Sequence, residues 1–383
     1  MNEQPIETSS TDNSALHIAL WLDSRQLPQE AAFIYSLAVA AKAEGCRVSV
    51  VAPAEADMGF LPALGPPVLL RPAGMAPTWL RSIRRPCMEI INQLKNAEVD
   101  VVVQFAPRDA SDPMEASLPR ELPVIRWIWD TMDLSVRSSL DRDTSHLIVV
   151  SQHALDQLGP DQSHISLIRP GILGVNLFSC AQRPPARPGC MVCLDAISDY
   201  QAFADLLDAC RRLLDEKIDF LLFLCDVGKA AHGIWKLSGE LGLLDRISFI
   251  PYRYDIDPLL AQADVYIQLT GSSRINYTTL RAMARNIPVI ADPGINDEFC
   301  VDGETCRAME HGRPDLLGET LRDILTHASS AREMAMRAAM NVQRYYGMND
   351  AVLRLIAISR QASGNPLALR SKNTTSRSRG LSE

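Results

Sequence analysis

The chain has 383 residues, of which 47% are hydrophobic and 22% charged, a balance typical of a globular protein long enough for two domains. Its formal net charge of -8 argues against a nucleic-acid partner, because such proteins usually present a basic surface. No apolar run approaches the roughly 20 residues of a membrane span, and the polar start lacks the apolar core of a secretory signal, so we expect a cytoplasmic protein.

The first half of the chain alternates apolar runs with helical patterns. Residues 1–14 are polar and are predicted to be disordered. The segments that follow are, in order, a strand at 17–23, a helix at 29–46, strands at 47–53 and 68–72, an amphipathic segment at 78–97, strands at 99–107, 123–130 and 146–151, a helix at 151–159 and a strand at 165–172. Strands that are apolar throughout predict a parallel sheet covered by helices on both faces.

Residues 173–189, with three prolines and two arginines, break this rhythm and are predicted to be a linker. The alternation then restarts. The predicted segments are strands at 190–197, 219–226, 246–252, 264–269 and 287–293, helices at 198–217, 229–244, 255–263 and from near Ser272, and a helical region from Arg313 to about Gln361.

This pattern predicts an α/β protein with two doubly wound, Rossmann-like domains that face each other across a cleft. The first would span 15–172 and the second 190–345, followed by a closing helix at 346–361 and a basic flexible tail at 362–383. Open sheets of this kind bind ligands at the carboxyl ends of their strands, so the cleft is the expected site.

The nine cysteines do not form a repeating framework, which favours reduced and mostly buried thiols. Cys190 and Cys193 have the spacing of a redox or metal motif. They lie in a predicted strand, however, where residues three apart point to opposite faces. No second pair lies nearby to complete a zinc site, so we expect no metal.

Several segments together resemble glycosyltransferase family four, a large group of GT-B enzymes that transfer sugars from nucleotide donors. In the second half they are RISFIPYRYDIDPLLAQADVYIQLTGSS, LRAMARNIPVIADPGINDEFCVDGETC and DLLGETLRDILTHASSAREMAMRAAMNVQRYYG. In the first half, HLIVVSQHALDQL and ISLIRPGI resemble the passage that leads into the interdomain linker. The resemblance spans roughly residues 15–358 and implies the GT-B fold.

The resemblance also implies an active site from which several groups are missing. The family's two glutamates, separated by seven residues, fall on Ser273 and Arg281, and its active-site histidine falls on Trp129, although the adjacent Asp130 is kept. The basic residues that neutralise the donor diphosphate are replaced by a run containing Asp195 and Asp199, and acids near a diphosphate repel it. The turn after the first strand contains no glycine.

Some donor-binding groups remain. Ser272 or Ser273 is predicted to cap the helix that follows, whose free amides would face the cleft and hold a phosphate. Arg274 and Arg281, two helical turns apart, would supply cations, unless both are ordinary surface residues. Asp130 would act as a base or hold a sugar hydroxyl, unless its role is structural.

The leading prediction is therefore a glycosyltransferase, of hexosyltransferase type, that builds a surface polysaccharide or glycolipid from a nucleotide-sugar donor and a glycan or lipid-linked acceptor, with no metal or other cofactor. The alternative is an inactive GT-B pseudoenzyme that serves as a binding or scaffolding partner of an active transferase. An oxidoreductase is disfavoured because no G-x-G-x-x-G follows the first strand.

Two basic segments bear on a membrane contact. Arg81, Arg84 and Arg85 cluster near Trp79 in the amphipathic segment, as in helices that lie on a membrane surface, but Pro86 interrupts it and favours a packed helix with a polar face. The tail is basic enough to touch anionic lipid, although a solvated chain end is the simpler interpretation. A peripheral position at the inner face of the membrane is compatible with both segments.

Overall fold

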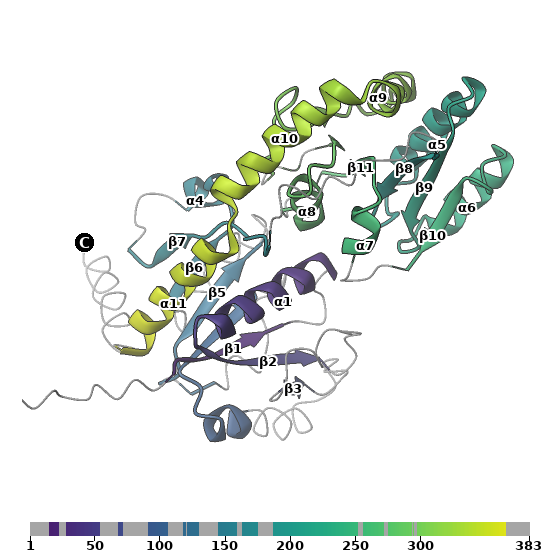
Figure 1. The fold of residues 1–383 in the computed structure, drawn as a ribbon. Helices are drawn as coiled ribbons and strands as arrows, with labels where there is room; N and C mark the ends of the chain where they lie inside the picture. The colour runs from purple at the N-terminus through teal and green to yellow at the C-terminus, as the bar shows by residue number, and fades with distance from the viewer. Residues whose placement is uncertain are drawn as a thin grey trace, which may run out of the picture.

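Two parallel β-sheets, one from each half of the chain, form the framework of the protein (Figure 1). The computed structural model describes residues 15–22, 28–53, 68–71, 91–105, 118–119, 121–129, 145–158, 163–174, 187–251, 256–271, 275–292, 294 and 297–364. We call each sheet with the helices that cover it a lobe.

The sheet of the first lobe is made of residues from the first half of the chain. Its strands are β1 (His17–Trp21), β2 (Arg47–Pro53), β3 (Val68–Arg71), β4 (Val101–Phe105), β5 (Val124–Ile128), β6 (His146–Val149) and β7 (Ile165–Leu167). They pair in the order β3-β2-β1-β4-β5-β6-β7, so β1 lies between β2 and β4. Every residue of β1, β4 and β5 is buried, as expected for strands covered on both faces.

The sheet of the second lobe repeats this arrangement. Its strands are β8 (Gly189–Cys193), β9 (Phe220–Cys225), β10 (Ile247–Ile250), β11 (Val265–Gln268), β12 (Val289–Ala291) and β13 (Arg307–Ala308). They pair in the order β10-β9-β8-β11-β12-β13, again with the reversal beside the first strand. Both sheets are therefore doubly wound, and the predicted fold class is confirmed.

Helices cover both sheets and connect them. They are α1 (Pro28–Ala43), α4 (Gln152–Gln157), α5 (Tyr200–Asp215), α6 (Ala231–Glu240), α7 (Asp257–Leu260), α8 (Tyr277–Met283), α9 (Pro314–Thr326), α10 (Ala328–Tyr345) and α11 (Met348–Gly364). In Figure 1, α10 and α11 follow one another from the second lobe toward the first, and α11 packs against α1. The carboxyl-terminal helix thus covers the lobe formed by the other half of the chain.

The chain passes between the lobes in two segments that are hydrogen-bonded to each other. The Ile172 amide donates to the Tyr346 carbonyl at 2.7 Å, and the Met348 amide donates to the Ile172 carbonyl at 3.3 Å. Ile172 and Gly347 form a parallel bridge. A side chain cannot fit at Gly171, because a Cβ there would lie 2.4 Å from the Met348 Cα. The start of α11 is therefore fixed to the end of the first lobe.

Buried apolar side chains form one large cluster that extends from the first sheet through α1, α8 and α11 to one face of the second sheet. A second cluster fills the space between the other face of the second sheet and helices α5, α6 and α9. Cys190 belongs to the first cluster and Cys193 to the second. The two thiols lie on opposite faces of β8, as the sequence predicted.

Several sequence predictions concern the ends of the chain, the amphipathic segment and the membrane. The helix expected at 346–361 is observed at Met348–Gly364, and β13 was not predicted. The start at 1–14, which was predicted to be disordered, and the tail after Gly364 lie outside the described residues. The amphipathic segment at 78–97 also lies outside them except for residues 91–97, of which 91–96 form a helix. No helix in the described ranges has the length and apolar character needed to cross a bilayer.

Candidate functional site

A cavity of about 320 Å³ lies between the two lobes. Its lining residues are Ala32, Tyr35 and Ser36 of α1, Ile172 and Leu173 of the first crossing segment, Asp257 of α7, Tyr277 and Arg281 of α8, and Arg285 just after α8. Helix α8 follows the carboxyl end of β11, which is the side of an open α/β sheet where ligands bind. The cavity therefore combines first-lobe hydroxyl groups with second-lobe charges.

The charges of this cavity form one ion-pair cluster. The Asp257 carboxylate is paired with Arg281 through Oδ1 and with the Nη2 of Arg285 through Oδ2, the latter at 2.6 Å. Arg281 is only 11% exposed, whereas Asp257 is 47% exposed. Two guanidinium groups thus hold a carboxylate whose remaining lone pairs are accessible to a ligand in the cavity.

Tyr277 connects the second lobe to the first through both its ring and its hydroxyl. The hydroxyl donates a hydrogen bond of 2.8 Å to the Gly171 carbonyl. The ring packs edge-on against Phe33 of α1 with 5.5 Å between the centroids. Burial raises the pKa of Tyr277 to about 12. The side chain is therefore a neutral element of the wall between the lobes.

Asp195 and Asp199 have structural roles that the sequence did not reveal. Asp195 accepts hydrogen bonds from the amides of Leu269 and Thr270 at 2.7 and 3.1 Å, so it fixes the loop after β11. Asp199 is the N-cap of α5 and accepts from the Gln201 amide at 2.9 Å. Both carboxylates are engaged with backbone groups of their own lobe.

The helix in which the sequence placed the donor-site residues begins later than predicted. Its N-cap is Asn276, whose side chain accepts a hydrogen bond from the Thr279 amide at 3.1 Å, so the prediction that Ser272 or Ser273 caps this helix is wrong. The physical reason is that Asn276 offers both an acceptor for the first turn and an amide for neighbouring carboxylates. The first turn of α8 is therefore partly satisfied by its own cap.

Two carboxylates surround this cap. The backbone amide of Asn276 donates a hydrogen bond of 2.8 Å to the Asp297 carboxylate, and its side-chain nitrogen lies 3.5 Å from the Asp195 carboxylate. Asp297 also accepts from the Gln268 side chain and the Gly294 amide, each at 3.0 Å. Burial raises the pKa of both Asp195 and Asp297 to about 6, although these hydrogen bonds oppose the shift. The start of α8 thus depends on two carboxylates, of which Asp297 is buried and Asp195 is half-buried.

The predicted site residues can be located only in part. Asp130, Ser272, Ser273 and Arg274 lie outside the described residues. Arg281 is described and lines the cavity, but it is a nearly buried partner of Asp257 rather than a surface cation. The described ranges hold no group of three or more His, Cys, Asp or Glu side chains arranged to bind a metal.

Trp129, on which the resemblance places a histidine, belongs to the core of the first lobe. It is 2% exposed, and its ring packs edge-on against Phe33 at 5.0 Å. Trp127 packs against the same phenylalanine at 5.1 Å. Trp129 therefore fills space behind α1 and does not contact the cavity.

Sequence reasoning missed Asp257, Arg285, Asn276 and Asp297. Two of them carried a signal: Asp257 lies just before Pro258 in the first turn of the helix predicted at 255–263, and Asn276 precedes Thr279 by the spacing of an N-cap. Arg285 and Asp297 gave none, because their partners lie far away in the sequence.

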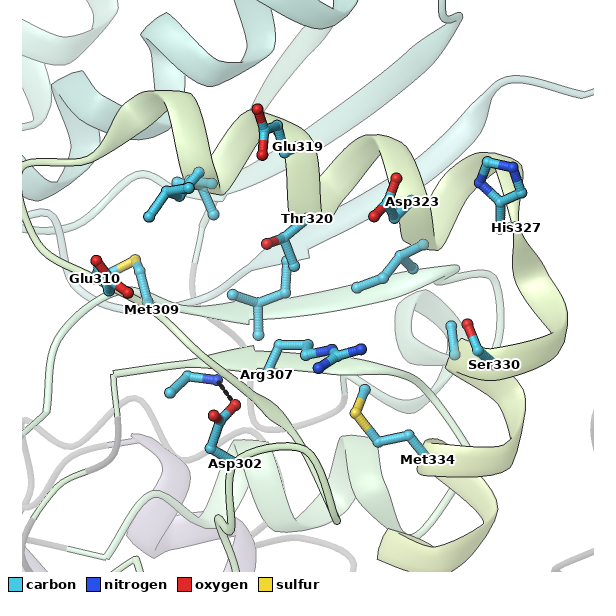
Figure 2. Close-up of a pocket in the computed structure, with 16 residues that line it drawn as sticks. Asp302, Arg307, Met309, Glu310, Glu319, Thr320, Asp323, His327, Ser330 and Met334 are labelled. Carbon is cyan, nitrogen blue, oxygen red and sulfur yellow. Dashed lines mark hydrogen bonds between the residues drawn. The ribbon is translucent and has the colours of Figure 1, made fainter.

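A larger cavity of about 570 Å³ lies elsewhere in the second lobe, between β13, α9 and the start of α10 (Figure 2). Arg307 extends into it between Asp302 and Met334, and Asp302 accepts a hydrogen bond of 2.8 Å from the Ala308 amide. Thr320 of α9 lies on the opposite wall. No predicted site residue lines this cavity.

Comparison with known proteins gives two kinds of similarity. Residues 181–341 match the family model described as Glycosyl transferases group 1. The lipopolysaccharide core biosynthesis glycosyltransferase LpsE of Rhizobium meliloti (strain 1021) is 23% identical over 177 residues, which are 45% of this chain and 51% of that protein. The match thus spans about half the length of that relative.

Solved structures are similar over nearly the whole chain. A glycosyltransferase from Rickettsia africae ESF-5 gives a TM-score of 0.71 at 14% identity and covers 91% of this chain and 98% of its own. HepE of Anabaena, in a complex with UDP-glucose, gives 0.71 at 16% identity, with coverage of 89% and 99%. At these identities the similarity shows a shared fold, and the site must be argued from its own residues.

Proposed function

We propose that this protein transfers a sugar from a nucleotide-sugar donor to a glycan or lipid-linked acceptor, because residues 181–341 match the family model of the group 1 glycosyltransferases and the chain has the GT-B fold. The relative LpsE, a lipopolysaccharide core biosynthesis glycosyltransferase, supports an acceptor in surface polysaccharide or glycolipid synthesis. HepE supports a nucleotide-sugar donor, since its structure holds UDP-glucose.

The observation that carries this proposal is the charged cavity between the lobes. Asp257 offers carboxylate lone pairs to sugar hydroxyls, while Arg281 and Arg285 place positive charge beside them. Tyr35 and Ser36 bring hydroxyl groups from the opposite lobe. A ligand that carries both hydroxyl groups and phosphates, such as a nucleotide sugar, fits this combination of donors, acceptors and charges.

In the proposed reaction an acceptor hydroxyl attacks the anomeric carbon of the donor sugar. The bond from that carbon to the phosphate oxygen breaks, its electron pair leaves with the nucleoside diphosphate, and the hydroxyl proton passes to a base. Positive side chains near the diphosphate stabilise the developing charge. We assign the base role to Asp130 and donor contacts to Ser272, Ser273, Arg274 and Arg281, of which only Arg281 lies in the described part of the chain.

One observation favours the second candidate, a pseudoenzyme that scaffolds an active transferase. Two residues at positions that the resemblance places near a donor have structural roles instead: Asp195 binds the loop after β11, and Trp129 lies in the core. A protein that kept only its fold would be built in this way. Such a protein has no need of a bound donor.

A thermal-shift screen against nucleoside diphosphates and their sugars distinguishes the two. A ligand at 100 times its dissociation constant adds about 2.7 kcal/mol of apparent stability, a clear upward shift in Tm. With a responding ligand in hand, Arg281→Ala should weaken binding, whereas Arg354→Ala, which removes a surface partner of Asp350 on α11, should leave it unchanged. Absence of a response to every nucleotide would favour the scaffold.

Binding alone does not demonstrate transfer, so a second assay is needed. The responding nucleotide sugar would be incubated with the protein and extracted glycan or glycolipid acceptors, and release of the nucleoside diphosphate would be followed. Release that depends on the acceptor supports the transferase. Binding without release would support a donor-sensing scaffold.

We also propose that the protein works at the inner face of the membrane, where a lipid-linked acceptor would be presented. The amphipathic segment at 78–97 and the basic tail at 362–383 would supply the contact. Co-sedimentation with vesicles that contain anionic phospholipid tests this, with neutral vesicles as the control. Equal recovery in the supernatant from both kinds of vesicle would contradict it.

A further inference from the structure

Glu298 connects the second lobe to the first. It lies in a tight turn in which the Cys300 amide donates to the Asp297 carbonyl at 2.8 Å. One Glu298 carboxylate oxygen accepts a hydrogen bond of 3.0 Å from the His153 amide in α4, and the other is paired with the Arg169 guanidinium at 3.2 Å. Both partners belong to the first lobe, so a single side chain engages two separate first-lobe segments.

The contact is partly sheltered from solvent. Arg169 is 30% exposed and Glu298 is 25% exposed, so water screens this pair less than an exposed surface pair. The Arg169 guanidinium also lies over the Tyr346 ring, 6.0 Å from its centroid. Tyr346 in turn accepts the amide hydrogen of Ile172. The pair is therefore continuous with the crossing segments that join the lobes.

The same turn is also tied to the candidate donor site. Asp297, the residue before Glu298, accepts hydrogen bonds from the Asn276 amide at the start of α8 and from Gln268 at the end of β11. Glu298 reaches α4 while its neighbour reaches α8. A change in the position of α8 would accordingly be transmitted through two adjacent residues to the first lobe.

We propose that Glu298 is a positioning residue that holds the two lobes in the arrangement seen in the structure, by joining α4 and Arg169 of the first lobe to the turn that supports α8. Its effect on sugar transfer depends on the function proposed above, whereas its effect on the lobes does not. The side chain contacts neither Asp257 nor Arg281 in the cavity, so it acts through the relative position of the lobes.

The test is hydrogen exchange followed by mass spectrometry on the full chain without ligand. In Glu298→Ala, amides of α4 and of the turn at 297–300 should exchange about tenfold faster than in the wild type, because loss of a charge-assisted hydrogen bond is worth about 1.4 kcal/mol or more. The radius of gyration measured by small-angle X-ray scattering should increase. Glu298→Gln, which keeps an acceptor for the His153 amide but loses its charge, should give a smaller change.

Glu240→Ala is the matched control, because Glu240 pairs only with Lys236 on its own helix at 3.6 Å among the described residues and is 59% exposed. It should leave exchange at α4 unchanged. Unchanged exchange at α4 in Glu298→Ala would overturn the proposal, and so would faster exchange spread evenly over both lobes, which would mean general destabilisation.

A kinetic readout becomes available if the transferase proposal holds. Glu298→Ala should then lower kcat with little change in the KM of the donor, since the cavity charges that would contact the donor are untouched. If no nucleotide binds, the transferase proposal fails while the exchange result still decides the role of Glu298. A raised donor KM with normal exchange at α4 would assign Glu298 to the donor site instead and overturn the positioning role.

Discussion

Arg281 of α8 is paired with Asp257 of α7, and the arginine is the buried partner while the carboxylate is the exposed one. The family resemblance implies a glutamate at the position of Arg281. In this chain the carboxylate comes instead from a different helix, and Arg281 and Arg285 hold it at the wall of the cavity between the lobes. The cavity therefore offers an acid that comes from α7 and not from α8.

Restoring the family's acid at this position should be destabilising. Arg281→Glu places a second carboxylate beside Asp257 in a nearly buried site, so we expect a loss of about 3 kcal/mol in the free energy of unfolding, measured by urea denaturation. Arg285→Glu is the comparison, because Arg285 is 28% exposed and its pair is more strongly screened. Equal losses in the two variants would contradict the view that Arg281 is the buried partner.

The crossing of the two interlobe segments should not tolerate a side chain at Gly171. A Cβ there would meet the Met348 Cα at 2.4 Å and the Gly347 carbonyl oxygen at 2.9 Å, and backbone atoms cannot move aside cheaply. Gly171→Ala should cost about 3 kcal/mol or more, or reduce the soluble yield. Gly364→Ala, at a position with open space, should stay within about 0.5 kcal/mol of the wild type in the same denaturation assay.

Loss of the Tyr277 hydroxyl should weaken the contact between the lobes. Tyr277→Phe leaves the buried Gly171 carbonyl without this donor, so a loss of about 1–3 kcal/mol is expected in thermal or urea unfolding. Tyr345→Phe serves as the control, because Tyr345 is 49% exposed. A Tyr277→Phe variant as stable as the control would show that the hydrogen bond contributes little.

The stability of the protein should depend on the ionisation of Asp297. Its folded pKa is raised to about 6 from an ordinary value of 3.8, so between these pH values the folded state binds more protons than the unfolded state. The contribution of this group to stability is therefore most favourable at low pH and falls as pH rises toward and past 6. A shift of about two units corresponds to about 3 kcal/mol.

This pH dependence is isolated by comparison with Asp297→Asn, which removes the titration. Urea unfolding of both proteins at pH 5 and pH 7.5 should show the wild type gaining relative stability at pH 5. Asp195→Asn should behave similarly, since burial also raises the pKa of Asp195 to about 6. A difference between wild type and variant that is the same at both pH values would sink this prediction.

Most of the fold could be predicted from local patterns. Runs such as VVVQF and VIRWI are apolar at every position, which identifies strands covered on both faces, and the helices between them fix the parallel order. The exceptions are instructive. Strand β13 has only two residues, too few to form a pattern. Helix α8 begins at Tyr277 because its N-cap is Asn276 and not one of the earlier serines.

The candidate site was less predictable, because its groups come from positions far apart in the chain. The sequence singled out Arg281, but its partner Asp257 lies on another helix and its neighbour Tyr277 bonds to Gly171 in the other lobe. Asp195 and Asp199 were expected to repel a diphosphate, whereas the structure commits them to backbone amides.

The sequence by itself determined the two doubly wound sheets and the opposite faces of Cys190 and Cys193, because strand and helix periods are local properties of the chain. Only the tertiary structure decided which charges meet: that Asp257 lies between two arginines, that Asn276 lies between two acids, and that Glu298 reaches α4. Those contacts depend on how elements separated by many residues pack together, and no local pattern encodes that packing.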